Sequence, residues 1–216
     1  MYPLLAARYW LWIDEVGGFV VCTGESVTIG QSPGLLAVDE PLIEVPLQAD
    51  ISRRHATIRR GGEGFWLETA REVSIDGQRV ERSAPLGRDS LITLRDVKLR
   101  FSQPHPWSLS ARLEFVSRHR TQPTCDGVLL VNDTLVLGPR ESSHVVCPGW
   151  DDELVLAWRQ GQWCLPGAGE PWQVDSGPGG VPLPGERPLE LPIRLVSPAG
   201  AISLTEFSNI RVSRTK

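Results

Sequence analysis

The segment from Ala49 to Arg60, ADISRRHATIRR, concentrates positive charge in a 216-residue chain whose formal net charge is -4. Ser52, Arg53 and Arg54 come directly before the alternating run HATIRR, which places them in a loop that leads into a strand. A loop hydroxyl, a backbone N–H and an arginine can converge on phosphate oxygens, with charge-assisted bonds of roughly 1.5–3 kcal/mol each. The segment therefore predicts a local anion site; the alternative is a solvated basic loop followed by an edge strand.

Other chemistries lack the residue patterns that they require. His144 and Cys147, with Cys125 and Cys164 elsewhere, are zinc-binding residue types, but paired ligands at short, regular spacing are absent. The sequence contains no P-loop and no complete dinucleotide-binding loop. We therefore expect no metal, no cofactor and no enzymatic activity.

Charge and composition limit the classes of partner. The mildly acidic chain argues against nucleic-acid binding, which normally needs a strongly basic face, and no apolar run predicts a membrane span. Four cysteines without a C-x-x-C pair favour a reducing compartment, so we expect a cytoplasmic protein, although an even number leaves disulfides open. The sequence does not predict the oligomeric state.

Short runs of β-branched and aromatic residues between turn signals predict an all-β fold with little helix, built as sandwiches of antiparallel strands. No long segment has the 3.6-residue periodicity of a helix. The runs in the first half are YWLWI, GFVVC, SVTIG, ATIRR, GFWLE, VSIDG, SLITL and VKLRF, and similar runs such as GVLLV and ELVLAW follow in the second half.

The order of these runs predicts two copies of one β-rich unit. SVTIGQ (26–31) is echoed by DTLVLGPR (133–140), and EVSIDG is echoed by PWQVDS. Between the copies, the segment SQPHPWS (102–108) has two prolines after a strand, and proline cannot continue a hydrogen-bonded ladder. We therefore predict one domain over residues 1–103 and a second over residues 104–216.

The first half resembles the forkhead-associated (FHA) domains, β-sandwich modules that bind phosphothreonine peptides through loops at one end. That family has a strand ending in Gly-Arg, a Ser-Arg-x-His loop, a Ser-Thr-Asn-Gly loop, an Asn-Gly turn and a Leu-x-x-Gly-Asp-x-Ile strand. The counterparts here are TIGQ, SRRHA, TARE, IDGQRV and LGRDSLITL. The resemblance implies a tandem FHA fold in which the first copy is divergent.

The resemblance also assigns roles to single residues. Ser52 would bond the phosphate, Arg53 would line the peptide groove with Arg54 beside it, and His55 would support the loop without touching ligand. Gly30 and Gly77 would support the site from the end of a strand and from a turn.

Two positions depart from the family pattern. Gln31 stands where the family has arginine, and a neutral amide cannot neutralise a phosphate of about -1.5 to -2 charge. Losing one charge-assisted bond corresponds to about tenfold in affinity, which Arg53 or Arg54 could offset. Arg71 aligns with the asparagine that holds the peptide backbone, where it either adds charge to the pocket or is a solvated loop residue.

The second half resembles a degenerate FHA-like domain. Its counterpart of SRRHAT reads WDDELV, whose acidic residues would repel a phosphate. We therefore expect an interaction module that recognises phosphothreonine peptides in Ser/Thr kinase signalling, with a phosphorylated protein, a kinase or its substrate as partner. The alternative is an FHA-fold scaffold that has lost phosphate recognition and binds partners or itself through another surface.

Overall fold

The computed structural model describes residues 8–32, 43–62, 64–166, 172–175, 181–182 and 187–207. In these ranges the chain is nearly all β, with twenty-two strands and no α-helix. The prediction of an all-β fold with little helix is therefore confirmed. None of the described residues belongs to a helix that is long and apolar enough to cross a membrane.

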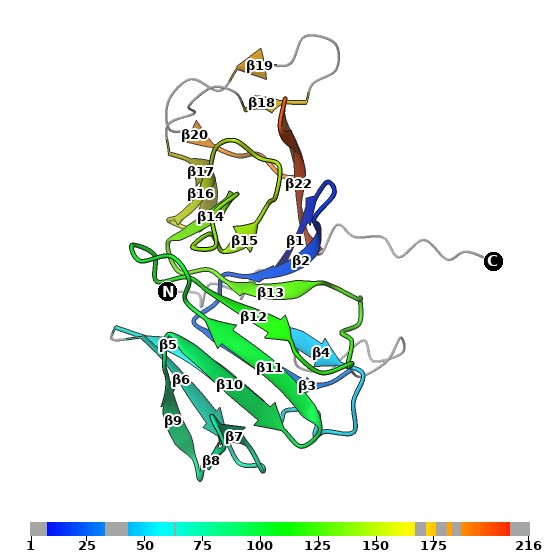
Figure 1. Ribbon diagram of the computed structural model, residues 1–216, viewed down its shortest axis with the longest axis vertical. Coiled ribbons are helices and arrows are strands. Elements are labelled where there is room, and N and C mark those ends of the chain that lie inside the picture. The colour runs from blue at the N-terminus through cyan, green and yellow to red at the C-terminus, as the bar shows by residue number, and fades with distance from the viewer. Residues whose placement is uncertain are drawn as a thin grey trace, which may run out of the picture.

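The strands form one large sheet and two small sheets (Figure 1). The large sheet has the spatial order β19 (Val181–Pro182), β18 (Gln173–Val174), β21 (Ile193–Ser197), β22 (Gly200–Glu206), β1 (Arg8–Ile13), β2 (Gly17–Cys22), β13 (Gly127–Leu130), β12 (Ala111–Phe115), β11 (Val97–Ser102), β10 (Asp89–Leu94), β7 (Ser74–Ile75) and β8 (Gln78–Arg79). One small sheet has the order β4 (Val45–Leu47), β3 (Ser26–Gln31), β5 (Ala56–Gly61), β6 (Gly64–Thr69) and β9 (Ser83–Leu86). The other has the order β15 (Val145–Val146), β14 (Thr134–Gly138), β16 (Leu154–Arg159), β17 (Gln162–Leu165) and β20 (Arg187–Pro188).

The strand order repeats after eleven strands. Adding eleven to each label converts the small sheet β4-β3-β5-β6-β9 into β15-β14-β16-β17-β20, and it converts β8-β7-β10-β11 into β19-β18-β21-β22. Two copies of one eleven-strand unit would produce this order. It also places the echoed segments SVTIGQ and DTLVLGPR on the equivalent strands β3 and β14. Descent of the two halves from one unit stays a prediction.

The two sandwiches exchange a β-hairpin. In the first sandwich, the small sheet with β3 faces the end of the large sheet from β13 to β8; in the second, the small sheet with β14 faces the end from β19 to β2. Hairpin β1–β2 pairs with β22 and so lies in the second sandwich, whereas hairpin β12–β13 pairs with β11 and lies in the first (Figure 1). The predicted boundary after residue 103 is therefore not a boundary between two separately closed sandwiches.

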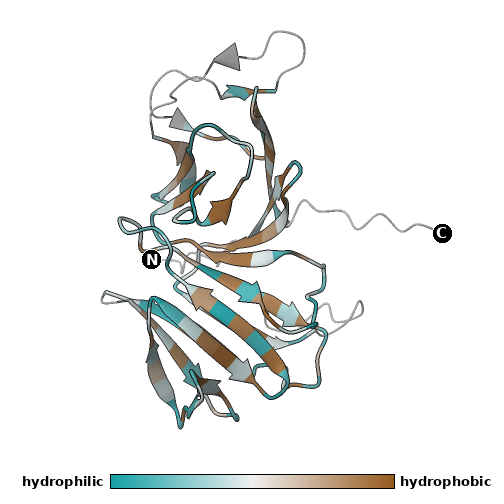
Figure 2. Cartoon of the chain, in the orientation of Figure 1, coloured by the Kyte–Doolittle hydropathy of each residue, from teal (hydrophilic) through white to brown (hydrophobic). Residues whose placement is uncertain are grey.

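The two central strands, β2 and β13, run parallel to each other and bury both of their faces. Along β2, Val20 and Cys22 belong to the core of the first sandwich, and Phe19 and Val21 belong to the core of the second. β13 alternates between the two cores in the same way. Because neighbouring side chains point to opposite faces of a strand, both strands are continuous apolar runs rather than apolar–polar alternations (Figure 2).

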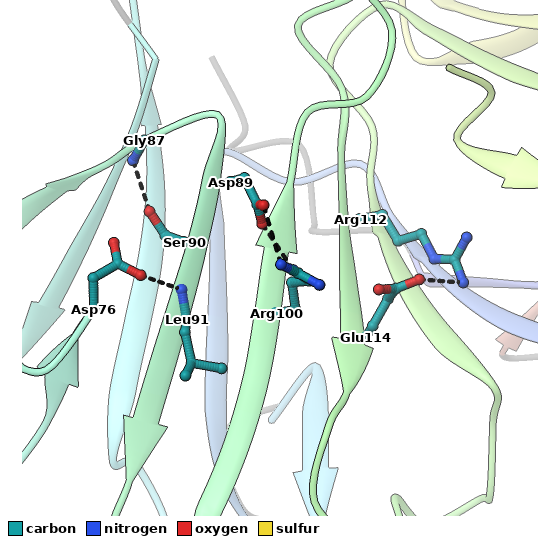
Figure 3. A network of polar contacts seen from close by, with 8 residues as sticks. All are labelled: Asp76, Gly87, Asp89, Ser90, Leu91, Arg100, Arg112 and Glu114. Atoms are coloured by element: carbon teal, nitrogen blue, oxygen red, sulfur yellow. Dashed lines mark hydrogen bonds and ion pairs between the residues drawn. The ribbon is translucent and has the colours of Figure 1, made fainter. Parts of the chain in front are cut away.

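The outer face of the large sheet over the first sandwich is polar (Figure 3). Along β11, Val97, Leu99 and Phe101 are buried, while the side chains of Lys98 and Arg100 between them are exposed. Arg100 donates from Nε to Oδ1 of Asp89 on β10 at 2.9 Å. Ion pairs this exposed contribute about 0–1 kcal/mol, so these charges mark the solvent face and contribute little to stability.

A buried polar side chain stands just before the edge strand of each small sheet. Oε2 of Glu44 accepts a hydrogen bond from the backbone N–H of Thr28 at 2.7 Å. In the second sandwich, Nδ1 of His144 accepts from the N–H of Val136 at 3.0 Å. Burial, followed by the repulsion of His105, lowers the pKa of His144 from 6.5 to about 4. His144 is therefore neutral in the folded protein near pH 7.

We expect the free energy of unfolding to fall as the pH is lowered from 6.5 to 4, because the unfolded chain binds a proton that folded His144 refuses. Above pH 6.5 both states are neutral at this residue, and below pH 4 both are protonated, so the loss is confined to that interval. The shift corresponds to about 3 kcal/mol. Urea denaturation at several pH values should give a steeper pH dependence for the native chain than for His144→Gln, and equal slopes would contradict the assignment.

Candidate functional site

Two connecting segments and the end of β3 meet at one end of the first sandwich, which we call the loop end. β3 pairs with β5 and β5 pairs with β6, both antiparallel, with Ala56 opposite Ile29 on one side and Thr69 on the other. The end of β3, the start of β5 and the end of β6 therefore lie together. The segments 48–55, before β5, and 70–73, after β6, are consequently neighbours at this end.

His55 ties these two segments together. Its side chain is 3% exposed; Nδ1 accepts the N–H of Ser52 at 3.2 Å, and Nε2 lies 3.0 Å from the carbonyl oxygen of Glu72. Because a carbonyl can only accept, the proton is assigned to Nε2 of a neutral ring. The imidazole thus fixes the turn Ser52–His55 relative to the segment 70–73, and its contacts are those of a loop support.

Gly30 allows the turn to sit directly against β3. A Cβ atom at Gly30 would lie 1.6 Å from the carbonyl oxygen of Arg53, so no side chain fits there. The N–H of Gln31 donates to the carbonyl of Ser52 at 3.1 Å, and the N–H of His55 donates to the carbonyl of Ile29 at 2.9 Å. These two bonds hold the turn on both sides of the glycine.

Thr69 is a further supporting residue, which the sequence analysis did not single out. Its Oγ1 donates to the carbonyl of His55 at 2.8 Å and accepts from the N–H of Arg71 at 2.9 Å. It therefore links the start of β5 to the segment 70–73. The sequence could have indicated this role, because Thr69 is the first residue of TARE, the counterpart of the family's Ser-Thr-Asn-Gly loop.

The arginines around the loop end open onto two shallow pockets. Arg54 and Arg82 line a pocket of about 670 Å³ over β5, β6 and β9. Arg71 and Arg79 line a second pocket of about 620 Å³, which adjoins the first because Ala70 belongs to both. All four arginines are exposed and can reach an anion that approaches from solvent.

The predicted site residues therefore fall into two groups. The backbones of Gln31, Ser52 and Arg53 are in contact, with Ser52 half-buried and the other two side chains exposed. Arg54 and Arg71 line the adjoining pockets, to which the first three residues do not contribute. The loop end thus presents one hydroxyl, one amide and several guanidinium groups, and the glutamates Glu68, Glu72 and Glu81 also line the pockets.

Gly77 lies farther along the fold, in the two-residue turn between β7 and β8. Asp76 and Gly77 have φ angles of 51° and 80°, the left-handed values that such a tight hairpin turn requires. Oδ1 of Asp76 accepts the N–H of Leu91 on β10 at 2.7 Å (Figure 3). This turn fixes the hairpin β7–β8 against β10, and Gly77 lines neither of the two pockets described above.

The second sandwich carries different residues at the equivalent end. β16 pairs with β14 through Leu154 and Leu137, as β5 pairs with β3 through Ala56 and Ile29, so Trp150 occupies the place of Ser52. Trp150 is buried against Trp172, with ring centroids 4.8 Å apart. The two residues that follow it, in the places of Arg53 and Arg54, are the exposed Asp151 and Asp152. The register thus reproduces the predicted alignment of SRRHAT with WDDELV.

No cluster of three His, Cys, Asp or Glu side chains within the described ranges could hold a metal ion. Comparison with curated proteins and with solved structures gave no significant match. A family model does match, over residues 27–95, from β3 through β10; it includes the turn Ser52–His55 and both adjoining pockets. This model is that of the FHA domain, so residues 27–95 of the first sandwich are similar to FHA domains.

Proposed function

We propose that the loop end of the first sandwich binds a phosphothreonine peptide, and that the protein is a non-enzymatic module in Ser/Thr kinase signalling. The FHA match supports a phosphopeptide-binding interaction module in general. The observation that carries the proposal is the turn Ser52–His55, which is held against Gly30 and tied to segment 70–73 by His55. A rigid turn can present its hydroxyl without losing further conformational entropy on binding.

Each residue has a defined role in this proposal. Ser52 donates its hydroxyl proton to a phosphate oxygen, and Arg53 and Arg54 supply positive charge. Gln31 donates from its amide but adds no charge, and Arg71 contacts the peptide from the rim. An extended peptide lies across the loops, and the pockets lined by Arg54 and Arg71 receive the side chains that flank the phosphothreonine.

The proposed partner is a phosphorylated protein, either a Ser/Thr kinase or its substrate. The second sandwich, with acidic residues at its equivalent end, contributes no phosphopeptide site of this kind. The described cysteines, Cys22, Cys125, Cys147 and Cys164, are all buried free thiols. This supports a reducing compartment, and we propose a cytoplasmic location.

Titration with phosphorylated and unphosphorylated forms of one pool of threonine peptides tests the proposal. We expect binding only to the phosphorylated pool, weakened about tenfold or more by Ser52→Ala and by Arg53→Ala, because each removes one charge-assisted bond. Arg100→Ala, on the outer face of the large sheet, is the charge-matched control for Arg53→Ala and should bind as the native chain does. Equal weak binding to both pools would instead support the scaffold that has lost phosphate recognition.

A further inference from the structure

The connection between β12 and β13, residues 116–126, lies at the loop end of the first sandwich. β12 runs antiparallel to β11, with Phe115 opposite Leu99, so it ends near the turn between β10 and β11. Arg95 in that turn forms an ion pair with Asp50 of the segment 48–55, at 3.1 Å. The connection therefore begins beside the loops of the candidate site, although it belongs to the other half of the chain.

This connection is docked along the free edge of β4. Thr121 forms an antiparallel bridge with Leu47, the N–H of Gln48 donates to the carbonyl of Arg120 at 2.8 Å, and the N–H of Gln122 donates to the carbonyl of Pro46 at 2.9 Å. Residues 120–122 thus extend the small sheet beyond β4 (Figure 1). The two backbone hydrogen bonds of this bridge fix their position relative to β4.

A side-chain contact joins the connection to the end of β3. The hydroxyl of Ser32 donates to Oε1 of Gln122 at 3.0 Å. Ser32 directly follows Gln31, the neutral residue at the position where FHA domains have arginine. Across this end of the sandwich, the segments therefore lie side by side in the order connection, β4, β3 and turn Ser52–His55.

The docking decides which way the arginines of the connection point. Thr121 is 1% exposed and faces the core, so its neighbours Arg120 and Gln122 face the opposite, solvent side of the extended sheet. Arg118, two residues before Arg120, is also exposed. Two strand spacings, about 10 Å, separate Thr121 from Gln31. The register places Arg120 on the same face as Gly30, the face on which the carbonyl of Arg53 packs, so a long arginine side chain can extend toward the turn Ser52–His55.

We infer that Arg120, assisted by Arg118, supplies to the phosphopeptide site of the first sandwich the positive charge that Gln31 lacks; this inference rests on the proposed function. A phosphate of about -1.5 to -2 charge can form charge-assisted hydrogen bonds to several arginines at once. Arg53 and Arg54 approach from the turn, and Arg120 approaches from the far side of β3. The one carboxylate of the segment 48–55, Asp50, is already paired with Arg95. The FHA-matched residues 27–95 alone therefore lack one wall of the site.

The test uses the full chain and a pool of nine-residue peptides with phosphothreonine at the centre and mixed residues elsewhere. Fluorescence anisotropy gives the apparent Kd at two salt concentrations, with the unphosphorylated pool as reference. We expect Arg118→Ala/Arg120→Ala to raise the Kd of the phosphorylated pool about tenfold or more and to weaken its salt dependence. The control Arg100→Ala/Arg159→Ala removes the same charge elsewhere and should leave the Kd unchanged.

A rescue variant separates a charge contribution from a structural one. Adding Gln31→Arg to Arg118→Ala/Arg120→Ala should recover most of the lost affinity, because it restores a guanidinium beside the same phosphate. A loop that merely lost its shape would not recover. An unchanged Kd in Arg118→Ala/Arg120→Ala, together with loss of binding in Ser52→Ala, would overturn this inference and leave the proposed function standing. Absence of phosphate-dependent binding by the native chain would overturn both.

Discussion

Residues 1–103 and residues 104–216, produced as separate fragments, are each expected to fail to fold alone and to form a stable one-to-one complex when mixed. The reason is the exchange of hairpins. The first fragment carries β1 and β2, whose partner β22 lies in the second fragment; the second carries β12 and β13, whose partner β11 lies in the first. Each fragment alone would therefore leave one sandwich without two strands of its sheet.

The side chains of β1 and β2 give the size of this effect. Leu11, Ile13, Phe19 and Val21 are at most 2% exposed and belong to the core of the second sandwich. At about 1.5–3 kcal/mol for each fully buried side chain, the four contribute about 6–12 kcal/mol. A whole domain is stable by only about 5–15 kcal/mol, so the second sandwich cannot tolerate their loss.

Circular dichroism and analytical ultracentrifugation of each fragment, and of the mixture, measure the outcome. A full-length chain cut by a protease site inserted in the segment 102–108 is the matched control, and it should remain associated after cleavage. A fragment 1–103 that unfolds cooperatively as a monomer would contradict the exchange, because hairpin β1–β2 would then have to fold back onto β11.

Gly30→Ala is expected to destabilise the first sandwich by more than about 3 kcal/mol and to abolish phosphopeptide binding. The new Cβ would lie 1.6 Å from the carbonyl oxygen of Arg53, and the obstructing atom is backbone, which cannot rotate away as a side chain can. Either the turn Ser52–His55 leaves β3, or the strand pairing breaks. Both outcomes remove the hydrogen bonds that position Ser52 and fall among the large effects of backbone strain.

Two other glycines provide graded controls for this substitution. Gly62, in the turn between β5 and β6, has no atom within 4 Å of the position of a Cβ, so Gly62→Ala should change stability by no more than about 0.5 kcal/mol. Gly138, the equivalent of Gly30 in the second sandwich, would meet Cγ of Glu153 at 2.7 Å and its Cα at 3.2 Å. Guanidinium denaturation should give the highest free energy of unfolding for Gly62→Ala, a lower one for Gly138→Ala and the lowest for Gly30→Ala. Equal free energies for Gly30→Ala and Gly62→Ala would contradict the close approach of Arg53 to Gly30.

The local patterns of the sequence were sufficient for the strands and for the turn at Ser52. Alternation, turn residues and β-branched content are local properties, and the motif around His55 places each residue within a few positions of its neighbours. The alignment of SRRHAT with WDDELV followed from the same kind of local order, and the pairings of Ala56 with Ile29 and of Leu154 with Leu137 agree with it.

The exchange of hairpins could not be predicted in this way. Hairpins β1–β2 and β12–β13 have similar apolar patterns, and either could in principle pair with β11 or with β22. Strand patterns predict that a strand is buried but not which distant strand it pairs with. The runs GFVVC and GVLLV did carry one usable signal, because continuous apolar character indicates burial on both faces.

The contribution of Arg118 and Arg120 was missed for a related reason. The segment SRHR has no motif of its own, and it reaches the loop end only because β12 and β13 lie in the first sandwich. Its docking depends on backbone contacts of Thr121 and Gln122 with β4. Backbone contacts do not require particular side chains, so they cannot be predicted from residue types.

The parallel pair of β2 and β13 at the centre of the large sheet makes each half of the chain necessary for the fold of the other half. Each half encodes two strands that the other half needs, so a deletion in either half of the gene removes both sandwiches. The second half is therefore needed for the fold of the first, whether or not it binds a ligand itself. Its acidic loop at Asp151 and Asp152 is free to diverge, while the hairpin ending at Leu130 is not.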